Sequence, residues 1–149
     1  AGFWKRSPER RLFSFIRLRN LFALDGWIMK IFFFMVGGSL GAISCYGVSL
    51  LAAHLFGTKF PWGTLAVNLA GCFLIGLAFA WGDRGLSIMN PSVRLFFMTG
   101  YLGALTTFST FGLETVTAFR GGNYLVSAAN LLANNVIGSL LGLLVGRLW

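Results

Sequence analysis

The sequence predicts an all-α integral membrane protein with four transmembrane helices. Of its 149 residues, 56% are hydrophobic and 11% are charged, whereas about 25% of residues are charged in an ordinary soluble domain. Four stretches contain no Asp, Glu, Lys or Arg: residues 31–58, 60–82, 95–113 and 121–146. Because a helix needs about 20 residues to cross a hydrocarbon core of roughly 30 Å, each stretch is long enough or nearly so. No soluble catalytic domain fits in the rest of the chain, so no enzymatic activity is expected.

Residues 1–26 are predicted to form a basic tail before a membrane domain of residues 27–149. Six of the 12 basic residues of the chain lie in this tail: Lys5, Arg6, Arg10, Arg11, Arg17 and Arg19. Beside a membrane span, anionic lipid is a simpler partner than nucleic acid. Aromatic residues alternate with these charges, which leaves two interpretations open: an amphipathic helix on the membrane surface, or a disordered cytoplasmic tail.

The first span is predicted at about residues 28–54. It contains Gly37-Gly38-Ser39-Leu40-Gly41-Ala42, a face of small residues that lets a neighbouring backbone come close. The span contains no acidic residue. Cys45 in this span and Cys72 in the next have no metal-binding or redox spacing, so we interpret both as small buried residues.

The second span is predicted at about residues 62–82. Thr64 and Asn68 are four residues apart and share one helix face, with Gly71 close by. An amide in hydrocarbon is costly unless it finds a hydrogen-bond partner. Asn68 therefore either belongs to a polar pathway or makes an interhelical hydrogen bond that serves packing alone, and both interpretations stay open.

The third span, at about residues 95–119, is predicted to be broken near its middle. Gly100 and Gly103 weaken helix geometry. Hydroxyl groups that can bond to freed backbone groups follow at Thr106, Thr107, Ser109 and Thr110. Freed carbonyl groups can bind a cation and freed amides can face an anion, so this stretch is either an ion-handling element or a site of close helix packing.

The fourth span, at about residues 124–148, has two different halves. Asn130 and Asn134 lie one turn apart on one face of its first half. Gly138, Gly142 and Gly146 repeat every four residues in its second half, a pattern typical of a close helix contact. The first half is therefore predicted to line a polar path or a buried network, and the second half to pack tightly.

Phe108 and Phe111 are three residues apart, so they point to roughly one side of a helix. Phenyl edges are electropositive and can contact a small anion without trapping it. Most phenylalanines of a membrane protein instead face lipid or fill the core. Spacing alone leaves both roles open.

Together these motifs resemble the Fluc fluoride channels, also called CrcB proteins, over about residues 37–149. The signatures are Gly-Gly-Ser-Leu-Gly-Ala in the first span and Gly63-Thr64-Leu65 with Asn68 and Gly71 in the second. The most specific signature is Thr99-Gly-Tyr-Leu-Gly-Ala-Leu-Thr-Thr-Phe-Ser-Thr-Phe in the third. The resemblance implies an antiparallel, dual-topology dimer in the inner or plasma membrane. It also implies two pores that export cytoplasmic fluoride passively and so reduce its toxicity, and a structural sodium ion (Na+) at the dimer centre.

The same resemblance implies a role for individual residues. Backbone carbonyls of Gly103 and Thr106 from each subunit are expected to bind the sodium ion, and Glu114 is expected near a vestibule. The fluoride pore is expected to be lined by Thr64, Asn68, Phe108, Ser109, Phe111, Asn130 and Asn134.

The chain departs from the family pattern in two respects. Cys45-Tyr46 stands where the family often has arginine followed by tyrosine, so a positive charge that attracts anions is missing. With four spans, ten basic residues lie on one side of the membrane, against Lys59 and Arg120 on the other. This bias favours one orientation. The partner is therefore either an oppositely oriented copy of the chain, which is the leading interpretation, or an oppositely oriented paralogue.

Two other functions are compatible with four short helices. A small multidrug-type exporter needs a carboxylate embedded in the membrane, and the first span has none. A membrane adaptor without transport activity needs only packing motifs, which would not explain Asn68, Asn130, Asn134 and the broken helix together.

Overall fold

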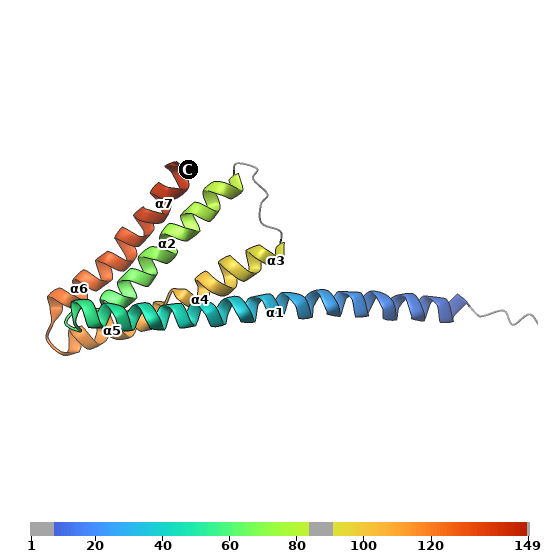
Figure 1. The fold of residues 1–149 in the computed structure, drawn as a ribbon, viewed down its shortest axis with the longest axis horizontal. Coiled ribbons are helices and arrows are strands. Elements are labelled where there is room, and N and C mark those ends of the chain that lie inside the picture. Colours follow the sequence, from blue (N-terminus) through green and yellow to red (C-terminus); the bar gives the residue numbers. More distant parts are fainter. Residues whose placement is uncertain (1–7, 84–90, 149) are drawn as a thin grey trace, which may run out of the picture. The chain divides into compact units, whose positions relative to one another are not determined.

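The fold is built entirely from helices in the part of the chain that the structure, a computed structural model, describes (Figure 1). This part comprises residues 8–83 and 91–148, with side chains described over 26–81 and 92–148. The elements are α1 (Pro8–Phe56), α2 (Trp62–Asp83), α3 (Pro91–Arg94), η1 (Leu95–Leu102), α4 (Gly103–Leu105), α5 (Phe108–Arg120), α6 (Tyr124–Leu132), η2 (Ala133–Ile137) and α7 (Gly138–Leu148); η1 and η2 are π-helical. The predicted all-α class is confirmed.

Three helices of the described chain are long and apolar enough to cross a membrane. They are Gly26–Phe56 within α1, Trp62–Trp81 within α2, and Tyr124–Leu148, which runs through α6, η2 and α7. The third span is divided near its middle, as predicted, because the backbone is extended at Thr106 and Thr107. The protein is therefore a helical membrane protein in which one segment is interrupted.

The chain divides into two compact units, Ala1–Phe32 and Phe33–Trp149. The first unit contains the predicted basic tail, whose side chains up to residue 25 lie outside the described residues. The helix contacts and the candidate site all lie in the second unit.

The turn between α1 and α2 contains the residues that end the first helix and begin the second. Gly57 has φ +77°, a left-handed conformation that glycine adopts without steric cost, and its N–H donates to the Ala53 carbonyl at 3.0 Å. The Pro61 carbonyl accepts from the Leu65 N–H at 3.1 Å and so begins the hydrogen-bond ladder of α2. A reversal of a few residues therefore brings α2 back beside the end of α1.

Glycines on α1 allow the third segment to pack directly on its backbone. A Cβ atom built on Gly37 would collide with the Phe96 carbonyl oxygen, and one on Gly41 would collide with the Tyr101 carbonyl oxygen. From the other side, a Cβ on Gly100 would lie 2.9 Å from the carbonyl oxygen of Phe34. The predicted small-residue face is confirmed, and Gly100 serves this contact.

A second glycine contact joins α2 to α7, which run side by side in Figure 1. A Cβ on Gly76 would lie 2.5 Å from the carbonyl oxygen of Gly142, and one on Gly142 would lie 3.2 Å from the Cys72 carbonyl oxygen. Lipid tails are as apolar as the side chains, so membrane helices associate mainly through such close packing. The predicted tight half of the fourth span is therefore confirmed.

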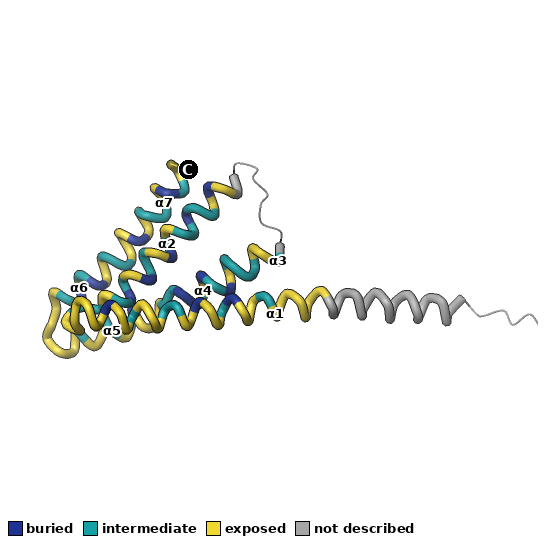
Figure 2. Tube along the Cα trace, viewed as in Figure 1, coloured by how far each residue is buried: buried dark blue, intermediate teal, exposed yellow. Residues whose placement is uncertain are grey.

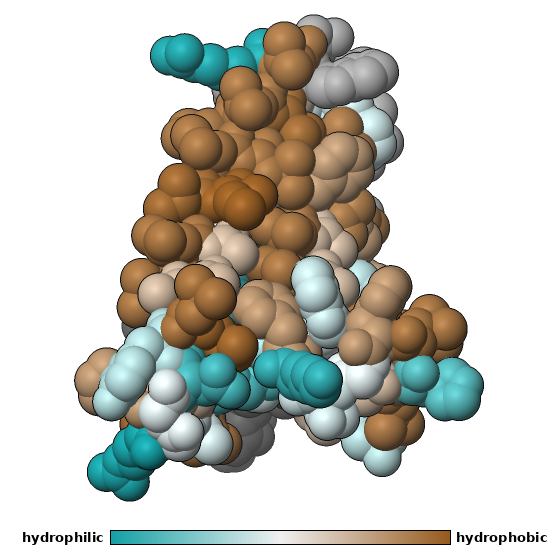
Figure 3. Space-filling view, turned by 90° about the vertical axis from the view of Figure 1, so that its left-hand side faces the viewer, coloured by the Kyte–Doolittle hydropathy of each residue, from teal (hydrophilic) through white to brown (hydrophobic). Residues whose placement is uncertain are grey.

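Little of the molecule is fully buried (Figure 2). A core of Val67, Leu102 and Leu105 joins α2, η1 and α4. Large apolar side chains are exposed along α1 and α7, and Figure 3 shows a face on which apolar residues form a broad band with hydrophilic residues at its ends. Such surfaces fit lipid contact, in agreement with a membrane location.

Candidate functional site

One face of α2 carries the polar residues on which the site is built. Thr64 and Asn68 lie on this face one turn apart, and Gly71 follows in the next turn. Thr64 is only 4% exposed, and Asn68 is half-buried. Because the residues around them on α2 are apolar, both side chains need hydrogen-bond partners on neighbouring helices.

The break in the third segment lies at Thr106 and Thr107, whose backbones are extended (φ/ψ −85°/140° and −131°/101°). The Thr107 N–H donates to Asn68 Oδ1 at 3.0 Å. A continuous helix would have given this N–H to the Gly103 carbonyl. A side chain of α2 therefore stabilises the break from outside the broken segment, and Gly71 leaves room for the Thr106 methyl group against α2.

The break lies near the middle of the third span, as predicted, but not at the glycines of this span. Gly100 and Gly103, which were predicted to weaken the helix, both lie within helical turns, and Gly103 has φ −63° and ψ −32°. The interruption comes three residues later, where Thr106 Oγ1 donates to the Leu102 carbonyl at 3.0 Å. A hydroxyl side chain thus bonds to a backbone carbonyl in the last turn before the break, as predicted for the hydroxyl residues of this segment.

Amide side chains continue the site from α2 towards α5. Asn68 Nδ2 donates to Asn134 Oδ1 at 2.7 Å, and Asn134 Nδ2 donates to Asn130 Oδ1 at 2.8 Å. Asn130 Nδ2 then donates to Thr115 Oγ1 at 3.0 Å. Asn130 is 1% exposed, so this partner is essential to its burial. The result is one connected polar network between the break and α5.

A cavity of about 370 Å³ lies beside this network. Its lining residues are Asn68, Gly71, Cys72, Ile75, Met98, Leu102, Gly103, Thr106, Phe108, Phe111, Asn134 and Asn135. The rings of Phe108 and Phe111 have centroids 5.4 Å apart and are tilted by 50°. Phe108 is 78% exposed, whereas Phe111 is 6% exposed. The cavity therefore combines amide groups with phenyl rings at the broken helix.

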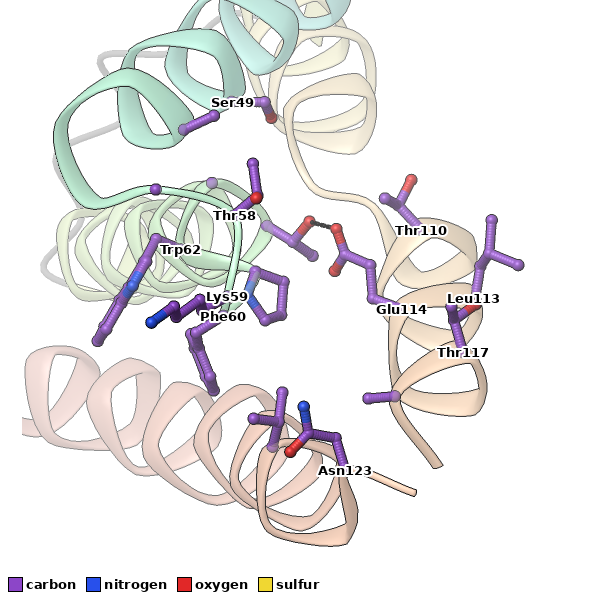
Figure 4. Close-up of a pocket in the computed structure, with 17 residues that line it drawn as sticks. Ser49, Thr58, Lys59, Phe60, Trp62, Thr110, Leu113, Glu114, Thr117 and Asn123 are labelled. Carbon is purple, nitrogen blue, oxygen red and sulfur yellow. Dashed lines mark hydrogen bonds between the residues drawn. The ribbon is translucent and has the colours of Figure 1, made fainter. Parts of the chain in front are cut away.

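A second cavity, of about 550 Å³, lies at the start of α2 (Figure 4). Within it Thr64 Oγ1 donates to Glu114 Oε1 at 2.7 Å, the dashed line in the figure. The second carboxylate oxygen, Oε2, is buried and has no hydrogen-bond partner among the described residues. Lys59 also lines this cavity, so a basic and an acidic side chain share it.

The predicted cation ligands, Gly103 and Thr106, lie at or just before the break. The Gly103 carbonyl loses its ordinary partner, because the Thr107 N–H bonds to Asn68 instead. The extended Thr106 backbone turns its own carbonyl out of the helix ladder, and a Cβ on Gly103 would meet nothing within 4 Å. Two carbonyl oxygens in an accessible place fit a hard cation such as sodium. Among the described residues, no cluster of three or more His, Cys, Asp or Glu offers a competing metal site.

The predicted site residues thus fall into distinct places. Asn68, Phe108, Phe111 and Asn134 meet at the smaller cavity with Gly103 and Thr106, whereas Thr64 and Glu114 meet at the larger one. Asn130 lines neither cavity but connects to Asn134. Ser109 is exposed and lines neither.

Two residues of the site, Thr115 and Asn135, were not among the predicted site residues. Thr115 accepts from Asn130, a contact between residues on different helices that no local pattern indicates. Asn135 lines the smaller cavity and donates from Nδ2 to the Leu131 carbonyl at 2.9 Å. Three asparagines in one span were a visible signal, but helical spacing singled out only Asn130 and Asn134.

Fold and site define a class: a helical membrane protein in which connected amides and an interrupted helix line an open cavity. Such breaks occur at membrane depth where protein or a polar cavity surrounds the backbone.

Comparison with known proteins is more specific. The chain belongs to the family of CrcB-like proteins, because the family model described as CrcB-like protein, Camphor Resistance (CrcB), matches residues 32–147.

Several similar proteins carry one name, Fluoride-specific ion channel FluC. That of Dehalococcoides mccartyi (strain CBDB1) is 44% identical over 112 residues, which is 75% of this chain and 85% of the relative. The protein of Salinibacter ruber is 43% identical over 114 residues (76% and 84%). The protein of Legionella pneumophila (strain Lens) is 47% identical over 113 residues (76% and 83%). The resemblance inferred from the motifs is confirmed.

Proposed function

We propose that the chain is the subunit of a passive, fluoride-specific ion channel that releases cytoplasmic fluoride across the inner or plasma membrane. The observation that carries this proposal is the position of Asn68, which joins the broken helix to the amide network at a cavity lined by two phenylalanines. The names of the relatives supply fluoride as the ion.

The chemistry of the cavity suits a small, hard anion. Asn68 and Asn134 each carry an amide N–H group, and the phenyl edges of Phe108 and Phe111 add weaker positive potential. An anion beside Asn68 takes the place of Asn134 Oδ1 as the acceptor of the Asn68 N–H. Because the anion and Asn134 Oδ1 compete for the same Asn68 N–H, the anion is held only weakly. Weak binding favours rapid passage.

The membrane potential drives export in this proposal. Hydrogen fluoride that enters a neutral cytoplasm by diffusion dissociates, which leaves fluoride inside. Moving one charge across 100 mV is worth about 2.3 kcal/mol, so a negative interior pushes fluoride out through a passive pore. The larger cavity with Thr64, Glu114 and Lys59 is then a vestibule at one mouth of the pathway.

The working unit in this proposal is an antiparallel dimer of this chain or of the chain with an oppositely oriented paralogue. Phe108 is 78% exposed in the protomer, and the face at Gly103 is open, so both are accessible to a second subunit. Gly103 and Thr106 of each subunit would then hold a central sodium ion. When bound, the ion would supply a fixed positive charge between the carbonyl groups of the two breaks.

Fluoride efflux from liposomes tests the channel. The purified chain is reconstituted, potassium permeability is supplied with an ionophore, and released fluoride is followed with an electrode, with chloride-loaded liposomes as the control. We expect rapid fluoride release and no chloride release. A folded chain that releases neither ion, alone or with an oppositely oriented relative, would exclude the proposal. Release only with the relative would identify the heterodimer.

The two phenylalanines should respond differently to replacement. Phe108→Ile is expected to lower fluoride flux at least tenfold and to leave the stability of the protomer fold unchanged, because Phe108 is exposed in the protomer. Phe111→Ile is expected to lower flux similarly and to cost about 1 kcal/mol of stability, because its buried ring is replaced by a different shape. Efflux assays and thermal unfolding measure the two effects. Unchanged flux in both variants would reject a pore role for these rings.

A further inference from the structure

Asn135 lines the smaller cavity but is not among the residues proposed to line the pore. Its Nδ2 donates to the carbonyl of Leu131, four residues earlier, at 2.9 Å. Asn134 does the same to the carbonyl of Asn130 at 3.0 Å. Two neighbouring side chains therefore compete for carbonyl groups that an α-helix uses in its own ladder. Such competition from a side chain four residues on loosens and bends a helix.

The helix is widened at this point. Residues Ala133–Ile137 form the π-helical segment η2, and the Gly138 N–H donates to the Ala133 carbonyl five residues earlier. A single π-helical turn inside a helix changes the direction of the side chains on one side of it relative to the other. A one-residue change of register in a helix corresponds to a rotation of roughly 100°.

The wide turn and the helix that follows it both contact the same neighbour, α2. After the turn, a Cβ on Gly138 would lie 3.2 Å from Cys72 Sγ, and Gly142 packs on the α2 backbone. At the turn, Asn134 accepts from Asn68 of α2 at 2.7 Å. The width of the turn sets the direction of Asn134 relative to the glycine contact, and so its aim at Asn68.

We propose that Asn135 is a positioning residue of the fluoride pathway: its hydrogen bond to Leu131 stabilises the wide turn that directs Asn134 to Asn68. This inference rests on the proposed channel function and goes further, because it assigns a role to a side chain outside the predicted pore set. Asn135 acts through Asn134 and is not itself required to touch the ion.

The test compares Asn135→Ala with Asn135→Ser in the full chain in liposomes. Alanine removes the donor, whereas a serine hydroxyl can donate to the same carbonyl four residues earlier. We expect Asn135→Ala to lower fluoride flux about fivefold, the effect of losing one ordinary hydrogen bond, and Asn135→Ser to retain most of the flux. Ser139→Ala, an exposed change one turn later on the same helix, is the control and should conduct like the unmodified chain.

A double-variant cycle separates positioning from a general loss of stability. If Asn135 acts through Asn134, the combined variant Asn134→Ala, Asn135→Ala should conduct no less than Asn134→Ala alone. Unchanged flux in Asn135→Ala would overturn the inference, as would a fivefold loss that persists in the Asn134→Ala background or that serine does not rescue. An unmodified chain that passes no fluoride would overturn the channel proposal and this inference together.

Discussion

Replacing Asn68 by leucine is expected to abolish fluoride flux and to destabilise the broken helix. The carboxamide oxygen of Asn68 accepts from the Thr107 N–H, and its nitrogen donates to Asn134. Leucine can do neither, so the Thr107 N–H and the Asn134 oxygen lose partners inside the protein. Each polar group left in this state costs about 1–3 kcal/mol. We expect flux to fall at least a hundredfold and thermal stability to fall measurably.

Efflux assays and thermal unfolding of the purified variant measure both effects. Ser139→Leu introduces the same side chain at an exposed position and should change neither quantity. A second variant, Asn68→Asp, keeps an acceptor for the Thr107 N–H but loses the amide donor. It should hold the helix break and still fail to conduct. Near-normal flux in Asn68→Leu would show that the pathway does not pass this residue.

The second large effect is a loss of stability that is expected at one of two adjacent glycines of α1. Gly37→Ala should destabilise the protein by at least about 2 kcal/mol, because the new Cβ would collide with the Phe96 carbonyl oxygen and force two backbones apart. Gly38→Ala meets nothing within 4 Å in the protomer, and alanine favours a helix over glycine by about 1 kcal/mol. We therefore expect Gly38→Ala to leave stability unchanged or to raise it.

This pair is its own control, because the chemical change is identical at neighbouring positions of one helix. Thermal unfolding in detergent and the yield of folded protein are the measurements. Equal stability of the two variants would show that α1 and the third segment do not pack through Gly37.

Hydropathy and residue spacing were enough to predict the helical membrane class. Charges are so rare that the apolar stretches are visible directly, and a spacing of four residues placed Thr64 and Asn68 on one face. The glycine contacts could be predicted for the same reason, since small residues repeated every four positions form a continuous face. These signals are local, and a helix preserves local spacing.

Local signals predicted a break near the middle of the third span, but not its exact residues or its cause. Gly100 is used for close packing, and its flexibility does not interrupt the helix. The break lies at Thr106 and Thr107 because Asn68, on a different helix, accepts the Thr107 N–H. A hydrogen bond between residues 39 positions apart leaves no periodic trace in the sequence.

The wide turn at Ala133–Ile137 was equally invisible. Its two amide-to-carbonyl hydrogen bonds use asparagines that also fit a regular helix, so composition alone does not distinguish the two geometries. The assignment of the individual pore and sodium residues stays a prediction, for which the variants above are the test.

The hydrogen bond from Thr107 to Asn68 has a thermodynamic consequence. In taking this N–H away from the Gly103 carbonyl, Asn68 frees an oxygen for the proposed cation, and the same side chain faces the cavity proposed for the anion. The occupancy of either ion therefore acts on the same short segment of backbone. If bound sodium changes the free energy of fluoride binding, bound fluoride must change the free energy of sodium binding by the same amount.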